Sequence, residues 1–220
     1  ALFADSKYAS RIPIGQKAVL DTFQHDVLRG FYDKWYRADL MSFIAVGDFE
    51  PAYMESLIVE YLSRVPAPAT PTVRPESPVP GHDETLFAIA TDPEATQNTV
   101  LVYHKHDRLE QQTVRVYRHS LMEGLYHGML NRRLYELTVQ AEPPFLGGYS
   151  GIGLSVRTKE FLLLGAAVEN NGFERGLDAL LTEASRVAQH GFTATELARQ
   201  KKQMLRGMEQ AFRERDKLQS

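Results

Sequence analysis

Six prolines crowd into one short stretch of this 220-residue chain, and no other feature constrains its fold as strongly. Proline lacks a backbone N–H and has a fixed φ angle, so it does not stand inside a helix or in a central strand. We therefore interpret residues 66–81 as a proline-rich linker between two domains, residues 1–65 and residues 82–220. The six prolines are Pro66, Pro68, Pro71, Pro75, Pro78 and Pro80.

The residues ahead of the linker follow helical and strand-like patterns in turn. Apolar side chains recur at three- and four-residue steps over residues 24–36 and again from Pro51 to Leu62, which predicts two helices. Between them, the apolar run over residues 40–46 predicts a short buried strand. We expect the order helix, strand, helix before the linker.

The residues after the linker predict the order ββαββαα. Single long helices between pairs of strands, with turns short enough to close each pair, are typical of an α+β fold. We expect a two-layer sandwich in which helices pack on a mostly antiparallel sheet. The predicted elements are strands over residues 85–90 and 99–104, a helix over 110–139, strands over 146–156 and 161–169, a helix that ends at Gly191, and a final helix from residue 194.

Two of these helices have recognisable capping residues at their predicted starts. Asn171 stands three residues before Glu174, and Thr193 stands three residues before Glu196. A short polar side chain followed at this spacing by a glutamate is the pattern of a capped N-terminus. We therefore predict that Asn171 caps one helix and that Thr193 and Glu196 form a capping box on the next.

The composition excludes several classes of protein. The 25 Lys and Arg residues against 28 Asp and Glu residues give a net charge of -3, which offers no electrostatic surface for nucleic acid. The longest apolar run, residues 161–168, is much shorter than the roughly 20 residues that span a membrane. With no Cys in the chain, a metal would need His and carboxylate ligands. We expect neither nucleic acid nor membrane as a partner, and the compartment stays unknown.

Histidines are the residues to test for metal binding. His119, Glu123 and His127 recur every four residues, so they share one stripe of the long predicted helix. A straight helix spreads the first and last of them about 12 Å apart, and a catalytic zinc needs three convergent ligands. We therefore favour an ordinary polar stripe over a zinc site, and we interpret His104 and His106 as polar residues at a strand end.

No catalytic motif of a self-contained enzyme occurs in the chain. Neither His-Glu-x-x-His nor His-x-x-Glu-His is present, and the glycine-rich phosphate loops and the Gly-x-Ser-x-Gly elbow are absent as well. Residues 147–151 (GGYSG) look superficially like a phosphate loop, but a predicted strand follows them where an anion site needs a helix N-terminus. We predict no catalytic residue and no metal ligand in this chain.

Three segments before the linker resemble the pitrilysin or insulinase family of zinc metallopeptidases. These are residues 11–15 (RIPIG), residues 28–37 (LRGFYDKWYR) and residues 41–48 (MSFIAVGD), in the order and spacing of the family. After the linker, residues 129–137 (MLNRRLYEL) and 190–197 (HGFTATEL) are similar to the second domain of the large bacterial members. The resemblance covers almost the whole chain.

The resemblance implies that the zinc site lies outside this chain. Family members bind zinc through an inverted His-x-x-Glu-His box and a later Glu, all of which would precede Ala1. Residues 1–65 would be the end of the catalytic domain without its zinc motif, and residues 82–220 would be a second, homologous domain without metal ligands. The fold would be that of the mitochondrial processing peptidase type. Because the chain begins with Ala1 and its last residues continue a helical pattern, we expect it to be a piece of a longer protein.

One family feature is missing where the resemblance would place it. Members carry an Arg-x(6)-Tyr pair that contacts the substrate, but Thr138 stands where the Arg would be, and the literal match from Arg29 to Tyr36 lies in the wrong helix. Because Thr138 replaces the Arg, we do not expect the second domain to contribute a substrate-contacting residue to catalysis.

The resemblance also implies a role for this piece in the parent protein. We expect a non-catalytic segment that shapes a closed chamber for peptide or unfolded protein substrates, next to the missing domains of the same polypeptide. Residues similar to a substrate-holding strand of the family are Phe145, Leu146, Gly147, Gly148 and Tyr149. The alternatives are that these glycines serve only sheet curvature or close packing, and that the chain is a binding or assembly module from a protein without the zinc site. The bacterial members favour a periplasmic location.

Overall fold

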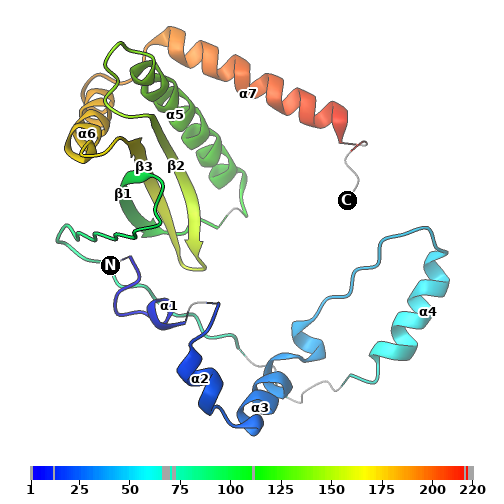
Figure 1. Ribbon diagram of the computed structural model, residues 1–220. Helices are drawn as coiled ribbons and strands as arrows, with labels where there is room; N and C mark the ends of the chain where they lie inside the picture. The colour runs from blue at the N-terminus through cyan, green and yellow to red at the C-terminus, as the bar shows by residue number, and fades with distance from the viewer. Residues whose placement is uncertain are drawn as a thin grey trace. The chain divides into compact units, whose positions relative to one another are not determined.

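The computed structural model describes residues 2–11, 13–65, 70, 73–110, 112–215 and 217, and it leaves the side chain of Leu154 undescribed. The chain divides into two compact units (Figure 1). One unit is Asp5–Ser77, and the other joins Ala1–Ala4 to Pro78–Ser220. The division falls inside the proline-rich segment, of which residues 66–69, 71 and 72 lie outside the described residues. The assignment of these units to two homologous domains stays a prediction.

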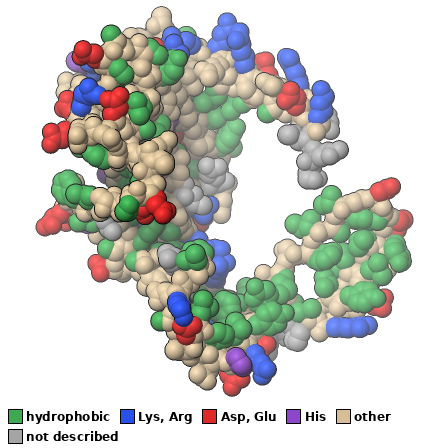
Figure 2. Space-filling model, viewed as in Figure 1, with side chains coloured by type: hydrophobic (Ala, Val, Ile, Leu, Met, Phe, Trp, Pro, Cys, Tyr) green, Lys and Arg blue, Asp and Glu red, His purple; other side chains and the backbone are tan. Residues whose placement is uncertain are grey.

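The unit Asp5–Ser77 is built from short helices, and none of them buries a side chain. The helices predicted over residues 24–36 and 51–62 are confirmed, the second with Pro51 in its first turn and the Glu50 side chain accepting from the Tyr53 N–H. Apolar side chains gather on the surface of α3 and α4 (Figure 2). The elements are α1 (Lys7–Ser10), α2 (Lys17–Thr22), α3 (His25–Trp35), the 3-10 turn η1 (Ala38–Leu40) and α4 (Pro51–Leu62).

The prediction of a buried strand over residues 40–46 is wrong. Leu40 ends η1, and the residues after it pair with no strand among the described parts of the chain. Phe43, Ile44 and Val46 are 57%, 82% and 78% exposed. A strand is stable only when its backbone groups pair with a neighbour and one face is buried, and the described residues supply neither.

The unit that contains Pro78–Ser220 is the predicted α+β sandwich, with one strand fewer than expected. Its three strands are antiparallel in the order β1-β3-β2. Residues 85–90 form no strand, and Phe87 and Ile89 are 87% and 93% exposed there, so that prediction is wrong for the same reason as the first. The elements are β1 (Asn98–Asp107), α5 (Val114–Thr138), β2 (Gly147–Val156), β3 (Lys159–Val168), α6 (Phe173–His190) and α7 (Ala194–Glu214).

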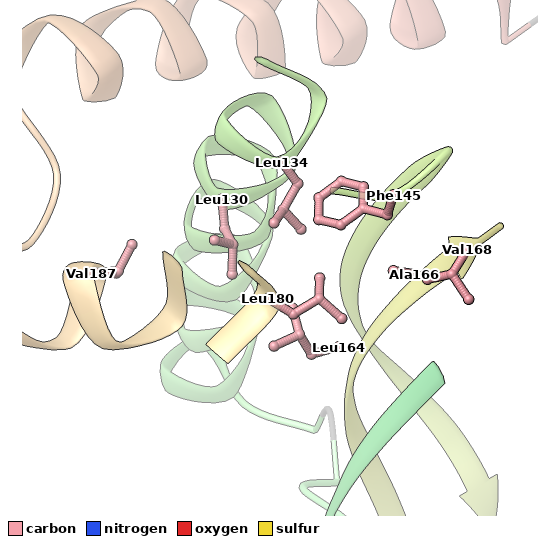
Figure 3. Close-up of a cluster of buried hydrophobic side chains, with 8 residues drawn as sticks. All are labelled: Leu130, Leu134, Phe145, Leu164, Ala166, Val168, Leu180 and Val187. Atoms are coloured by element: carbon pink, nitrogen blue, oxygen red, sulfur yellow. The ribbon is translucent and has the colours of Figure 1, made fainter. Parts of the chain in front are cut away.

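Two helices cover one face of this sheet. α5 packs on β2, α6 packs on β3 and β1, and α7 packs on α5 (Figure 1). Close approaches occur at Gly176, where a Cβ would lie 2.5 Å from Val168 Cγ1, and at Gly128, where it would overlap the Gln200 side chain. Between the layers, side chains from α5, α6 and β3 pack together with Phe145, which lies just before β2 (Figure 3). This core consists of Leu130, Leu134, Phe145, Leu164, Ala166, Val168, Leu180 and Val187.

The two predicted helix caps have opposite outcomes. The capping box of Thr193 and Glu196 is present at α7, with both reciprocal hydrogen bonds formed. Asn171, in contrast, does not cap α6: its backbone takes the left-handed conformation at φ 63°, and Gly172 occupies the cap position without a side-chain bond. Asn tolerates this conformation better than most residues, so Asn171 serves the turn between β3 and α6.

Candidate functional site

The face of the sheet opposite α5 and α6 carries apolar and aromatic side chains with no described helix over it. Alternate residues of a strand face opposite sides, and Leu164, Ala166 and Val168 of β3 point into the core. The odd-numbered residues of β1, of β3 and of β2 as far as Gly153 therefore share the uncovered face, which we call the open face. Its cross-strand rows are Leu101–Gly165–Tyr149, Tyr103–Leu163–Gly151 and Lys105–Phe161–Gly153.

The glycines of β2 differ in what surrounds them. A Cβ at Gly148 would lie 2.8 Å from the Phe145 ring and 3.4 Å from Leu134, so close packing against the core explains this glycine. A Cβ at Gly147, Gly151 or Gly153 would meet nothing within 4 Å. Gly151 and Gly153 leave a side-chain-free lane on the open face, which Tyr149 separates from Gly147. No packing contact among the described residues accounts for these three glycines.

The five residues predicted to hold substrate do not act as one surface. Phe145 is 1% exposed and belongs to the core, and the ring fixes the chain where it enters β2. Leu146 is 61% exposed while its N–H donates to the Ala167 carbonyl at 2.8 Å. Gly147 and Tyr149, which is 45% exposed, lie on the open face, whereas Gly148 faces α5. The prediction that these residues bind substrate stays a prediction.

Asn131 of α5 binds the backbone of β2 at Ser150. Its Oδ1 accepts from the Ser150 N–H at 2.5 Å, and its Nδ2 donates to the Ser150 carbonyl at 2.9 Å. Backbone groups of an antiparallel edge strand point alternately toward the neighbouring strand and away from it. The Ser150 groups are therefore those directed away from β3, toward the free edge of β2, and the Asn131 carboxamide takes the place of the next strand there.

The Ser150 side chain is tied to the same helix. Its hydroxyl lies 3.0 Å from Nδ1 of His127, and both residues are buried, at 6% and 9% exposure. Burial lowers the pKa of His127, and the nearby carboxylate of Glu123 opposes this shift without cancelling it. A neutral imidazole that exchanges a hydrogen bond with a hydroxyl needs no counter-charge in the core.

The described residues contain no group of three His, Cys, Asp or Glu side chains that could hold a metal ion. In the stripe His119, Glu123 and His127, the first two pair at 3.2 Å while the third is directed at Ser150. His106 Nδ1 lies 3.1 Å from its neighbouring Asp107 carbonyl. The donor set of these residues does not fit zinc, which needs three convergent protein ligands.

Arg133 of α5 joins the three helices of this unit. Its guanidinium donates to both carboxylate oxygens of Glu196, at 2.6 and 2.9 Å, to Glu183 at 3.2 Å, and to the Gly191 carbonyl at 3.2 Å. The guanidinium also lies 4.9 Å from the centre of the Phe192 ring. Glu183 is nearly fully buried, and Arg186 is its second partner at 2.9 Å.

The pKa values follow from this geometry. The hydrogen bonds from Arg133 are the main reason that the pKa of Glu196 falls to about 2, and the bonds from Thr193 add to the effect. The same pair raises the pKa of Arg133. Arg133 and Glu196 therefore stay charged over the physiological range, and their ion pair fixes the turn between α6 and α7 against α5.

Sequence reasoning missed Asn131, Ser150 and Arg133 as an organised group. The capping box marked Glu196, but nothing in the spacing indicates that its carboxylate also meets an arginine 63 positions earlier. Asn131 and Ser150 are 19 positions apart and belong to no motif. No α-helix in the described parts of the chain combines the length and the apolar composition that a membrane span requires.

Comparison with known proteins places this architecture in context. Residues 22–204 match the family model described as the peptidase M16 inactive domain. A protein of Arabidopsis thaliana called zinc protease PQQL-like is 31% identical over 216 residues, which are 98% of this chain and 20% of that protein. The probable zinc protease PqqL of Escherichia coli (strain K12) is 25% identical over 197 residues, covering 89% of this chain and 21% of that protein.

Solved structures show the same fold. The crystal structure of the first half of the periplasmic protease PqqL from Escherichia coli has a TM-score of 0.87 at 25% identity, and the match covers 99% of this chain and 47% of that one. The structure of PqqL itself has a TM-score of 0.87 at 24% identity, covering 99% of this chain and 24% of that one. The chain thus spans about a fifth of the length of the curated relatives it matches.

Proposed function

Because the chain belongs to the family of peptidase M16 inactive domains, we propose that it is a non-catalytic segment of a zinc metalloendopeptidase and forms part of the wall of the chamber in which peptides are cut. The relatives it matches are named as zinc proteases, and each is about five times longer than the matched segment. In the parent protein, zinc would lower the pKa of a bound water and so supply the nucleophile. The ligands for that ion would lie in other parts of the polypeptide.

The observation that carries the proposal is the open face. Helices bury one side of the three-stranded sheet, while Leu101, Tyr103 and Tyr149 on the other side are 39%, 37% and 45% exposed. An apolar sheet face without a covering layer marks a surface that meets something else. A chamber that admits unfolded peptides needs such a wall, because extended chains present apolar side chains and backbone groups together.

A finer part of the proposal concerns residues 145–149 of the β2 segment. We propose that an extended substrate pairs with the free edge of β2 over this stretch, as in other cases of strand addition. Gly148 directs its backbone groups to the same side as Ser150, two residues further along. Since Asn131 already binds the Ser150 groups, the substrate strand would end before that residue.

A binding or assembly module from a parent without a zinc site is the second candidate. The sequence that precedes Ala1 in the parent protein discriminates between the two, because only the peptidase requires an inverted His-x-x-Glu-His box there. A periplasmic location is also proposed, on the basis of the periplasmic protease whose structure is similar.

The chamber wall can be tested by photocrosslinking in the full-length parent protein. Tyr149 on the open face and Tyr135 on α5 are 45% and 54% exposed, so they form a matched pair. Each is replaced in turn by p-benzoylphenylalanine, and a flexible fluorescent peptide is added with the zinc site blocked by a chelator. We expect crosslinks from position 149 and not from position 135. Equal crosslinking from both positions, or crosslinking from position 135 alone, would contradict a peptide-facing sheet.

The isolated 220-residue chain provides a second test. We expect no cleavage of the same peptide, with or without added zinc, because the described residues hold no ligand set for a catalytic ion. Chelator-sensitive cleavage by this chain would refute its assignment as a non-catalytic segment.

A further inference from the structure

One end of the open face is already occupied by a short segment of the same unit. The ring of Phe3 lies 6.0 Å from the ring of Phe161, and Phe161 in turn meets Tyr103 edge-on at 5.2 Å. Aromatic pairs at these separations attract one another beyond the area they bury. Phe3 belongs to no helix or strand, so this ring contact is not imposed by regular structure around it.

The backbone beside Phe3 is held as well. Lys105 Nζ donates to the Leu2 carbonyl at 3.3 Å and to the Pro80 carbonyl at 2.8 Å. An ammonium has three donors, and it forms stronger hydrogen bonds to a carbonyl than a neutral donor does. Lys105 and Phe161 are cross-strand partners in the register, so the aromatic contact and the carbonyl contact come from adjacent positions on one face.

The neighbouring strand leaves room for a longer chain. Gly153 is the partner of Phe161 on β2, and Gly151 is the partner of Leu163. A Cβ at either glycine would meet nothing within 4 Å, so β2 places no side chain of its own next to the aromatic rings at these two positions. A peptide backbone could run along this lane with one side chain turned toward Phe161.

We propose that Tyr103, Lys105 and Phe161 form a subsite for an aromatic residue of an extended peptide, and that Leu2 and Phe3 occupy it as an intramolecular ligand. The three groups would recognise an aromatic ring and the carbonyl of the residue before it. The subsite therefore requires one aromatic residue in the peptide and leaves the rest of its sequence unspecified. The role of the subsite in substrate handling rests on the proposed function. Its ability to bind a peptide does not, because it needs only residues of this chain.

The intramolecular ligand should weaken the apparent affinity of the subsite for a free peptide. A segment tethered next to its site acts at a millimolar effective concentration, so it competes well with a weak free peptide. If the tethered segment fills the subsite about nine-tenths of the time, removing the Phe3 ring should tighten peptide binding about tenfold.

The test is a titration of the 220-residue chain with fluorophore-labelled acetyl-Ala-Leu-Phe-Ala-amide, followed by anisotropy. We expect Phe3→Ala to lower the Kd about tenfold relative to the unmodified chain, and Phe161→Ala in the Phe3→Ala background to abolish that gain. Phe87→Ala, which removes a ring that is 87% exposed and outside the strands, is the matched control and should change nothing. The peptide with Ala in place of Phe should bind weakly to every variant.

Two further substitutions guard against misfolding. In the Phe3→Ala background, Phe161→Leu keeps most of the buried volume, and Lys105→Met keeps the aliphatic stem while removing the ammonium. Each should weaken binding at least threefold with the melting temperature unchanged. An unchanged Kd in Phe3→Ala, equal binding of the Ala peptide, or retained binding in the Phe161 variants would overturn the proposal. Any of these results would leave the crosslinking outcome in the parent protein unaffected, so the two proposals fail separately.

Discussion

The carboxamide of Asn131 binds both backbone groups of Ser150, one through its oxygen and the other through its nitrogen. The Asn131 side chain thus acts as a one-residue substitute for a fourth strand at the edge of the sheet. Unpaired edge groups invite pairing with another chain, and folded proteins limit such pairing by covering part of the edge. Here, α5 covers the edge of β2 at Ser150, and the proposed strand addition would use the backbone groups of Gly148 beside it.

Replacing Asn131 tests how much this contact stabilises the sheet. We expect Asn131→Ala to lower the free energy of unfolding by about 1–3 kcal/mol, because Ser150 is buried and its N–H and C=O would lose their partner. Urea titration followed by circular dichroism measures the change. Gln203→Ala removes an exposed amide on α7 and should alter stability by less than about 0.5 kcal/mol. Equal losses in the two variants would show that the contact contributes nothing.

Two adjacent arginines of α5 provide a matched comparison of ion pairs. Arg133 is 17% exposed and bonds to two carboxylates, whereas Arg132 is 52% exposed and pairs with Glu136 of its own helix. We expect Arg133→Met to cost about 2–4 kcal/mol, since it leaves Glu183 buried with one partner fewer. Arg132→Met should cost about 0–0.5 kcal/mol. A loss that is no larger for Arg133 than for Arg132, measured by urea unfolding, would contradict the role assigned to the network.

The same network predicts a loss of stability in acid. The pKa of Glu196 lies at about 2 in the folded chain and at its ordinary value of 4.5 when unfolded. Its charged form is favoured by folding, so its contribution is fully present above pH 4.5 and is lost as the pH falls toward 2. Unfolding measured between pH 6 and pH 2.5 should show a steeper decline for the unmodified chain than for Glu196→Gln. Parallel curves would rule out this carboxylate as a source of acid sensitivity.

We expect His127 to make the free energy of unfolding depend on pH near neutrality. Burial lowers the pKa of its imidazole, so the folded state binds the proton less readily than the unfolded state does. The stabilising effect of the neutral ring is present above about pH 6.5 and declines as the pH falls below that value. The imidazole faces Glu123 and the Tyr126 ring from its own helix and the Ser150 hydroxyl from β2. Unfolding free energies between pH 8 and pH 5 should decline less for His127→Gln than for the unmodified chain. A decline of equal size in His127→Gln would exclude this ring.

Two glycines of β2 differ in the space beside them, so their substitution by Ala should change stability in different ways. Gly148→Ala would drive a methyl group into the Phe145 ring, and we expect a loss of about 1–3 kcal/mol. Gly151→Ala places its methyl group in open space on the other face, and it should be neutral or stabilise by up to about 1 kcal/mol through the unfolded chain. Thermal unfolding of the two variants checks both values. A similar loss in Gly151→Ala would mean that its glycine has a structural role after all.

Periodicity determined most of the local structure, because it depends only on neighbours in the sequence. The stripe of α5, the capping box of Thr193 and Glu196, and the strands around residues 99–104 and 161–169 were all predictable in this way. The strands predicted over residues 40–46 and 85–90 failed because apolar, β-branched composition creates a tendency to extend without supplying a partner. Pairing is a property of two segments, and the described residues hold no second segment for either.

The family resemblance and the lack of a zinc box could be seen in the sequence alone, since both are properties of residue order. Only the tertiary structure decided which face of the sheet stays open, that Asn131 closes the edge at Ser150, and that Arg133 meets Glu183 and Glu196. These contacts join residues 19 to 63 positions apart, and their geometry follows from how α5, α6 and α7 pack. No local pattern records that packing, because its driving force is the shared burial of side chains from all the layers.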